Sequence, residues 1–337
     1  MKNVTFVLVA SASLVLLLLA GSARAARKDD CENAGGTYYK FTQTITQPAG
    51  SNANQGEKFD RSYCVKWHPA CETENCPAMI QLNVNKLFSK ADEDKVVIAE
   101  IYDCNDRGAD PVDCLAEIPR RMLDSTDYRV DRNAIFLLGF SAGTGGISRG
   151  LCSRNQLQGD SSEFGTLSDV IAGIGFSGGC PSCSSDWAPI CGNMHVLATN
   201  GDKDQFAQDF CEKGLRAFAA LNGCDHPDAK WCNVDQDDIY LTAPKGDGSS
   251  KLRKLSFGQC AGGDVVGYVF ADEGHELSYN ANWDPAIKSY NIQYNYFLKR
   301  AKQGGETGSG SSAPCSGQGS QQSVSLDRPK DPRPVTV

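Results

Sequence analysis

The sequence is poor in histidine and has no concentration of positive charge. Only four histidines occur among its 337 residues, so few side chains can act as a general base near neutral pH. Lysine and arginine form no basic stripe, and the formal net charge is −8, which argues against a nucleic-acid partner. The only Asn-x-Ser/Thr sequon is at Asn3, so no N-glycosylation is expected beyond the N-terminal segment.

Beyond residue 25, no apolar run is long enough to cross a membrane. Residues 1–25 themselves have the pattern of a secretory signal peptide. Lys2 provides a positive start, an apolar run extends from Val4 to Ala20, and Ala23-Arg24-Ala25 is a cleavage signal. An uncleaved membrane anchor is the alternative that the length of this run permits. We expect cleavage and secretion, no stable membrane association, and a net charge that changes from −8 to −10 on loss of Lys2 and Arg24.

Cysteine is unusually abundant, and all fifteen cysteines lie beyond the expected cleavage site. In an oxidising compartment most should form disulfides, although an odd number leaves at least one unpaired or intermolecular. Cys315, in the polar C-terminal region, is our candidate for that one. The pair Cys180 and Cys183 has zinc or redox spacing, but no second Cys-x-x-Cys completes a four-cysteine site. We expect a structural bridge there, and neither a metal nor another cofactor.

The composition separates a folded region from a tail. Residues 26–302 have the composition of one globular domain that is long enough to bury a large core. Residues 303–337 are rich in Gly, Ser, Gln and Pro and have almost no large apolar side chains. That composition predicts a disordered tail.

Within the domain, short apolar or β-branched runs alternate with helical patterns. The predicted strands are Met79–Val84, Lys95–Tyr102, Asn133–Phe140, Val170–Phe176, Met194–Asn200 and Val265–Ala271. Helices are predicted from Asp110-Pro111 to about Asp124, over Gln205–Leu221, and after Trp283-Asp284-Pro285. Pro119 should kink the first helix. The alternation predicts an α/β fold with a mainly parallel central sheet, helices on both faces and disulfide-rich loops.

The pattern Gly139-Phe140-Ser141-Ala142-Gly143 follows an apolar run and precedes small residues that suit a helix starting close to the strand. Gly-x-Ser-x-Gly between a buried strand and a helix is the nucleophile elbow, in which a strained turn exposes the serine Oγ. A second copy surrounds Ser177, but the chain continues there into a Cys-Pro turn rather than a helix. We therefore predict Ser141 as the nucleophile, with Ser177 as the alternative.

A serine nucleophile needs an imidazole to take its proton. His275 directly follows the last predicted strand and lies C-terminal to Ser141, where the base is needed. His68 and His226 precede prolines in cysteine-rich loops, and His195 opens a predicted strand. We expect structural roles for these three and a catalytic role for His275.

A carboxylate must orient the imidazole, and it should follow the second strand after that of the nucleophile. The strand predicted at that place ends in Gly201-Asp202-Lys203-Asp204, so either aspartate could serve. A polar turn without catalytic function is the other interpretation of this composition.

Four segments resemble the secreted α/β-hydrolase esterase family that includes feruloyl esterases and polyhydroxybutyrate depolymerases. They are Pro77–Asn85, Tyr128–Asn133 with Leu138–Gly143, Asn200–Asp204, and Cys260–Val265 with Gly274-His275. The resemblance covers roughly residues 75–300, implies an α/β-hydrolase fold, and favours Asp204 over Asp202 as the acid. Two positions depart from the family pattern. Asn83-Val84 replaces a His-Gly pair, and Glu276-Leu277 replaces the Trp-Pro that usually follows the histidine.

We therefore expect a secreted serine carboxylic-ester hydrolase that acts through an acyl-serine intermediate. Its catalytic residues would be Ser141, His275 and Asp204, and its oxyanion hole the backbone amides of Ala142 and of Val84 or Asn85. By the resemblance, candidate substrates are aromatic-acid esters of polysaccharides, and polyesters. The altered Asn83-Val84 pair leaves one alternative, a binding or structural protein that keeps the fold without catalysis.

Overall fold

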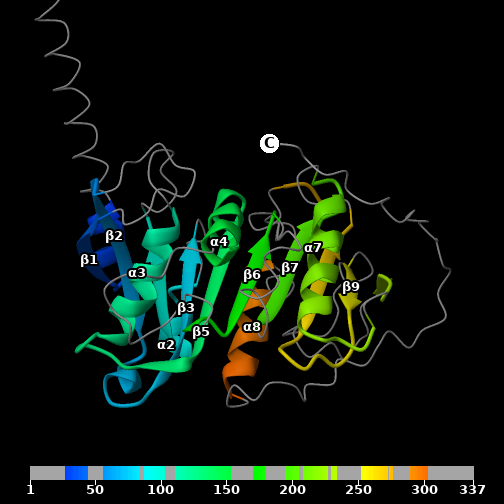
Figure 1. The fold of residues 1–337 in the computed structure, drawn as a ribbon. Coiled ribbons are helices and arrows are strands. Elements are labelled where there is room, and N and C mark those ends of the chain that lie inside the picture. Colours follow the sequence, from blue (N-terminus) through cyan, green and yellow to red (C-terminus); the bar gives the residue numbers. More distant parts are fainter. Residues whose placement is uncertain are drawn as a thin grey trace, which may run out of the picture.

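The computed structural model describes residues 27–44, 56–82, 87–102, 111–152, 170–179, 194–204, 208–226, 229–233, 252–271, 273–275 and 289–302. In these residues ten strands form one sheet in the order β1-β2-β4-β3-β5-β6-β7-β10-β9-β8 (Figure 1). The strands are β1 (Thr37–Thr44), β2 (Lys58–Trp67), β3 (Cys76–Leu82), β4 (Val97–Ile101), β5 (Val130–Phe140), β6 (Gly173–Ser177), β7 (His195–Gly201), β8 (Cys232–Asn233), β9 (Leu252–Ser256) and β10 (Val265–Phe270). Residues 27–33 are helical, and the named helices are η1 (Pro69–Glu72), α2 (Lys90–Glu93), α3 (Pro111–Leu123), α4 (Ala142–Cys152), α7 (Gln208–Leu221) and α8 (Ser289–Lys302).

The centre of the sheet is parallel. Strands β4, β3, β5, β6, β7 and β10 run in one direction. The hairpin of β1 and β2 adds antiparallel strands at one edge, and β9 and β8 add them at the other. Strands β6 and β7 are buried along their whole length, as expected for strands that are covered on both faces. The predicted α/β class with a mainly parallel sheet is confirmed.

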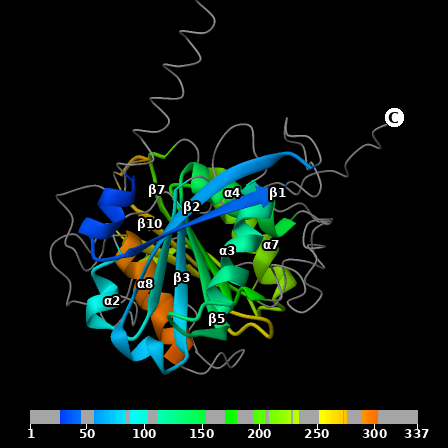
Figure 2. The same cartoon turned by 90° about the vertical axis from the view of Figure 1, so that its left-hand side faces the viewer.

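Helices cover both faces of this sheet. Figure 2 shows α3, α4 and α7 on one side of the strands and α2 and α8 on the other. Successive side chains of a strand point to opposite faces, so β3 and β5 each contribute to two separate apolar clusters. Ile80 and Leu137 belong to one cluster, and Met79 and Phe136 belong to the other. Each face of the sheet therefore packs against its own apolar core.

The six predicted strands are all present, with described ends within about three residues of the prediction. Strands β1, β2, β8 and β9 were not predicted. In β1 the side chains alternate, so that Phe41 and Gln43 are buried while their neighbours are exposed, and no continuous apolar run marks the strand. Two of the predicted helices, α3 and α7, start within three residues of their predicted starts, and α3 contains Pro119. The predicted cap of the last helix at 283–285 lies outside the described residues.

Three disulfides join described segments: Cys31–Cys64, Cys71–Cys76 and Cys224–Cys260. The first ties the helical residues 27–33 to β2, and the third ties the end of α7 to the segment before β10. Cys211 is also disulfide-bonded. These cross-links agree with the prediction of a disulfide-rich domain and fit an oxidising compartment.

Several expectations fall on parts of the chain that the structure does not describe, namely the signal peptide, the tail, the bridge at Cys180 and Cys183, and Cys315. In the described part, no helix has the length and apolar character needed to cross a membrane.

A buried polar cluster fastens α8 to the amino ends of β7 and β10. His195 Nδ1 accepts a hydrogen bond from the amide of Asp264 at 3.0 Å, and Tyr296 Oη donates one to the Asp264 carbonyl oxygen at 3.2 Å. The Arg300 guanidinium pairs with the Asp264 carboxylate, and both side chains are buried. His195 accepts through a ring nitrogen, so it is neutral here and has a structural role.

This cluster predicts how stability changes with pH. Burial, together with the charge of Arg300, lowers the pKa of His195 from 6.5 to about 4. Between these two values the unfolded chain binds a proton that the folded protein does not, so the free energy of unfolding falls as the pH falls from 6.5 to 4. In His195→Asn, whose amide oxygen can still accept from Asp264, we expect a smaller loss over this range in urea unfolding.

Asp264 acts in the opposite direction in both proteins, because burial raises the pKa of its carboxyl and stability is then lost as the pH rises. The difference between wild type and variant therefore isolates the histidine. An identical pH dependence in the two proteins would contradict a buried, neutral His195.

Candidate active site

Ser141 stands at a sharp turn between β5 and α4. Its φ is 52°, and among the described residues it is the only non-glycine with a positive φ. Its amide donates to the Ser177 carbonyl oxygen at 2.9 Å, and its own carbonyl oxygen accepts from the Thr144 amide at 3.0 Å and from Thr144 Oγ1 at 2.6 Å. A left-handed serine is strained, so these bonds hold the turn in a conformation that the chain would not otherwise favour.

The glycines on either side of Ser141 are required by close packing. A Cβ on Gly139 would lie 2.8 Å from the Ile147 side chain and 2.9 Å from the backbone of Gly143. A Cβ on Gly143 would lie 2.5 Å from the carbonyl oxygen of Leu82, in β3. The helix therefore begins in contact with two strands, and Gly-x-Ser-x-Gly is here a consequence of backbone distances.

His275 reaches Ser141 from the loop that follows β10. Its Nε2 lies 2.7 Å from Ser141 Oγ, and its Nδ1 lies 2.9 Å from Asp204 Oδ2. An ionised carboxylate can only accept, so Nδ1 carries the proton and Nε2 is free to accept from the serine hydroxyl. Phe140 packs beside the imidazole, with 5.5 Å between ring centroids. The three residues form one hydrogen-bonded chain.

Asp204 lies in the loop that follows β7, and this loop is bonded to the histidine loop. The Asp202 amide donates to the Phe270 carbonyl oxygen at 3.0 Å, and the Lys203 amide donates to that of Glu273 at 2.8 Å. The Asp204 side chain is 0% exposed, whereas His275 is 32% exposed. The structure thus places Asp204 at the imidazole and joins Asp202 to β10 through its backbone.

The second Gly-x-Ser-x-Gly segment, around Ser177, is hydrogen-bonded to the turn at Ser141. Ser177 is buried at the end of β6, and its carbonyl oxygen receives the Ser141 amide. A Cβ on Gly175 would lie 2.9 Å from Gln293 of α8, and one on Gly179 would lie 2.1 Å from Thr144 of α4. These glycines allow the helices on both faces to approach β6, which is a structural function.

The other histidines lie elsewhere. His68 caps η1, since its Nδ1 accepts from the Ala70 amide at 3.1 Å. The amide of His226 donates to the Phe257 carbonyl oxygen at 2.9 Å, near the Cys224–Cys260 disulfide. With His195 in its buried cluster, these three have the structural surroundings that the sequence predicted.

One of the two predicted oxyanion donors can be located. Ala142 is the first residue of α4, so its amide belongs to the first-turn N–H groups that have no partner within the helix. Val84 and Asn85 lie outside the described residues. The end of β3 is nevertheless close to the turn, since Leu82 contacts the position of Gly143.

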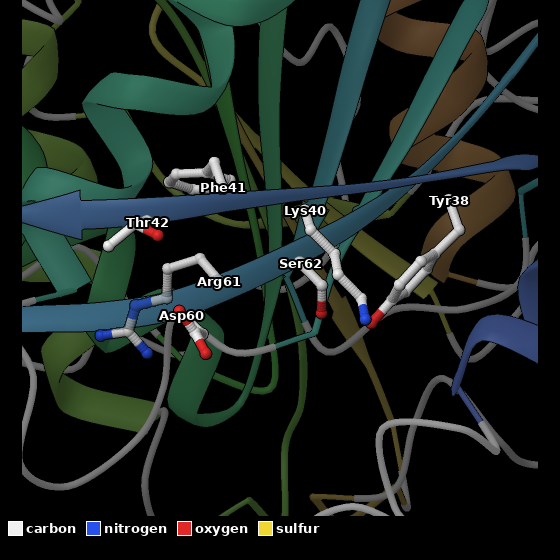
Figure 3. Close-up of a pocket in the computed structure, with 7 residues that line it drawn as sticks. All are labelled: Tyr38, Lys40, Phe41, Thr42, Asp60, Arg61 and Ser62. Atoms are coloured by element: carbon white, nitrogen blue, oxygen red, sulfur yellow. The ribbon is translucent and has the colours of Figure 1, made fainter.

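A cavity of about 250 Å³ lies away from these residues, on the hairpin of β1 and β2. Figure 3 shows the Lys40 amine directed towards the Tyr38 hydroxyl at one end and Asp60 beside Arg61 at the other. None of the lining residues belongs to the Ser141–His275–Asp204 chain. Among the described residues there is also no cluster of three or more side chains suited to hold a metal ion.

No protein-family model and no curated protein matches the chain. Solved structures match weakly. An acetyl xylan esterase from Aspergillus awamori is 10% identical, with 76% of this chain and 99% of that one covered and a TM-score of 0.45. A thermostable esterase is 12% identical, with 81% and 63% covered, so the chain spans less than two thirds of it, at a TM-score of 0.41. Thermogutta terrifontis esterase 2 is 11% identical, with 73% and 88% covered and a TM-score of 0.41.

Structural similarities this weak carry no information about activity. The chain has the α/β-hydrolase fold, as its own strand order, the elbow after β5 and the loops after β7 and β10 show.

The elbow predicts a matched pair of glycine substitutions. Gly143→Ala should lower the free energy of unfolding by about 1–3 kcal/mol, because its methyl group meets the Leu82 carbonyl oxygen in a packed backbone. Gly145→Ala, two residues further along α4 and with open space around it, should leave stability unchanged or raise it by about 0.5–1 kcal/mol. Urea unfolding measures both, and equal effects would contradict the close contact between α4 and β3.

Proposed function

We propose that the protein is a serine hydrolase that cleaves carboxylic esters through an acyl-serine intermediate. The proposal depends on the unbroken hydrogen-bond chain from Ser141 Oγ through His275 to Asp204. It also requires a nucleophile and base that a substrate can reach, and Ser141 and His275 are both partly exposed.

In the first half of the reaction, Ser141 Oγ attacks the ester carbonyl carbon while His275 Nε2 takes the hydroxyl proton. The tetrahedral intermediate collapses when Nε2 returns that proton to the departing alkoxide, which leaves the acyl group on Ser141. In the second half, water attacks the acyl-serine with His275 as the base, and the acid product and free serine are released.

Asp204 would orient the imidazole and stabilise its positive form. Its buried carboxylate keeps the Nδ1 proton in place, so that Nε2 always faces the serine. Asp204 does not itself need to take up a proton. The backbone bonds between its loop and the histidine loop keep this geometry during the reaction.

The negative oxygen of the intermediate needs donors at a fixed place. We assign the Ala142 amide as one donor and the amide of Val84 or Asn85 as the other. Neither donor is a side chain, so the replacement of the family's His-Gly by Asn83-Val84 can leave the oxyanion hole intact.

Our proposal for the acyl and alcohol groups of the substrate rests on the resemblance to feruloyl esterases and polyhydroxybutyrate depolymerases. This resemblance suggests aromatic-acid polysaccharide esters or polyesters as substrates. On the same grounds we assign residues 1–25 to a removable signal peptide, residues 26–302 to the catalytic domain and residues 303–337 to a tail. The reaction as written requires no cofactor.

Covalent labelling tests the nucleophile. A fluorophosphonate should modify Ser141, and peptide mass mapping should find the adduct there, because this hydroxyl shares a hydrogen bond with His275. Ser141→Ala and His275→Ala should each abolish nearly all turnover of a p-nitrophenyl ester, and the double variant should be little worse than either. Ser177→Ala is the control with the second motif, and we expect it to keep the wild-type rate. An adduct on Ser177 would overturn the assignment, and an inert wild type would favour a binding protein.

The two aspartates of the β7 loop offer a second test. Asp204→Asn should lower kcat by about a thousandfold or more, because an amide does not hold the required histidine tautomer. Asp202→Asn keeps its backbone bond to Phe270 and should change kcat by less than about threefold. Comparable losses in both variants would mean that the acid has been assigned wrongly.

A further inference from the structure

Asn200, in β7, is a buried side-chain amide that joins three parts of the molecule. The residue is 3% exposed. Its Oδ1 accepts from the amide of Gly179, just beyond β6, at 3.1 Å, and its Nδ2 donates to Cys211 Sγ, in α7, at 2.7 Å. The same sulfur, which belongs to a disulfide, lies 3.6 Å from the Gly179 carbonyl oxygen. Gly179 is thus held from β7 and from α7.

The side chain of Asn200 lies on the sheet face that carries the elbow helix. Successive side chains of a strand alternate between the two faces, and Val196 and Ala198 precede Asn200 at intervals of two. Both belong to the apolar cluster that also contains Ile147 of α4. This face is covered by α3, α4 and α7 (Figure 2). Asn200 continues the row to the carboxyl end of β7, where the proposed site lies.

Gly178 and Gly179 lie between the elbow and the histidine loop. A Cβ on Gly179 would meet the Thr144 side chain, whose Oγ1 donates to the Ser141 carbonyl oxygen. A Cβ on Gly178 would lie 3.2 Å from the His275 carbonyl oxygen. Because packing this close transmits strain, a shift of the two glycines would reach both the nucleophile and the base.

The two glycines need bonds from their neighbours to stay in place. Glycine has more conformational freedom than any other residue, and Gly178 has a positive φ of 57°. Its amide donates to the Thr199 carbonyl oxygen at 3.1 Å. At Gly179 the partner of the amide is the Asn200 side chain, so a side chain there continues the support that the backbone of β7 begins.

We propose that Asn200 is a positioning residue of the ester-hydrolysing site, an inference that rests on the proposed function. It acts through Gly178 and Gly179, which keep the elbow and the histidine loop at the separation that places His275 Nε2 2.7 Å from Ser141 Oγ. A misplacement of about 1 Å can lower the rate of a reaction by about a hundredfold. Loss of the Asn200 amide should therefore lower kcat and leave substrate binding nearly unchanged.

The test is Asn200→Ala, which removes both of these side-chain hydrogen bonds. For a p-nitrophenyl ester we expect kcat to fall by about tenfold or more, with KM within about twofold of wild type. The rate constant for fluorophosphonate labelling of Ser141 should fall by a similar factor, because labelling uses the same serine and base. All rates are measured well below the melting temperature of each variant. Asn200→Ser takes its place, with the same expectations, if the alanine variant does not fold.

Asn222 offers a matched control at the other end of the same strands. It follows α7 and is 1% exposed, and its Nδ2 donates to the carbonyl oxygens of Met194 and Gly263 at 2.8 and 2.7 Å. Asn222→Ala therefore also removes two hydrogen bonds of a buried asparagine, and the melting temperature should fall in both variants. We expect kcat and the labelling rate to fall in Asn200→Ala and to stay at the wild-type level in Asn222→Ala.

The outcomes separate this inference from the proposed function. An Asn200→Ala enzyme with the wild-type kcat and labelling rate would overturn the role of Asn200 alone. Equal losses of kcat in Asn200→Ala and Asn222→Ala would also overturn it, since the effect would then come from a general loosening of the fold. A wild-type protein that hydrolyses no ester and takes no label at Ser141 would overturn both proposals.

Discussion

The left-handed backbone of Ser141 is the constraint on which the rest of the site depends. An L-residue in this conformation costs of the order of 1–3 kcal/mol, and the surrounding packing has to offset it. Strand β6 contributes the Ser177 carbonyl oxygen, and β3 presents Leu82 so closely that Gly143 can carry no side chain. The turn is therefore held from two neighbouring strands as well as by its own helix. The strand order, with β5 between β3 and β6, is what makes this possible.

The same strand order brings the other two residues to the serine. Ser141, Asp204 and His275 each follow the carboxyl end of a strand, namely β5, β7 and β10, and β6 lies between β5 and β7. Because β7 and β10 are neighbours, their two loops can exchange backbone bonds, and the Lys203 amide donates to Glu273. The histidine is thus attached to the acid loop independently of its side-chain bond to Asp204. Removal of that carboxylate should leave the loop in place, so a loss of rate would report on chemistry.

Much of this arrangement follows from local sequence, and some of it cannot. The buried parallel strands could be predicted because they are apolar along their length, and the order serine, aspartate, histidine restricts the partners of Ser141 to a few residues. The choice of Asp204 over Asp202 needed a family resemblance, because both follow the same strand and only tertiary contacts distinguish them. Strand β1 was missed because its two buried side chains, Phe41 and Gln43, alternate with exposed ones, so no continuous apolar run marks it.

Buried polar groups lie at both ends of the parallel strands. At the amino edge, His195 accepts from the Asp264 amide and Arg300 pairs with the Asp264 carboxylate, and these contacts fasten α8. At the carboxyl edge, burial raises the pKa of Glu100 to about 7. The buried polar groups of the amino edge thus attach a covering helix, whereas the carboxyl edge carries the residues of the proposed reaction, Ser141, Asp204 and His275.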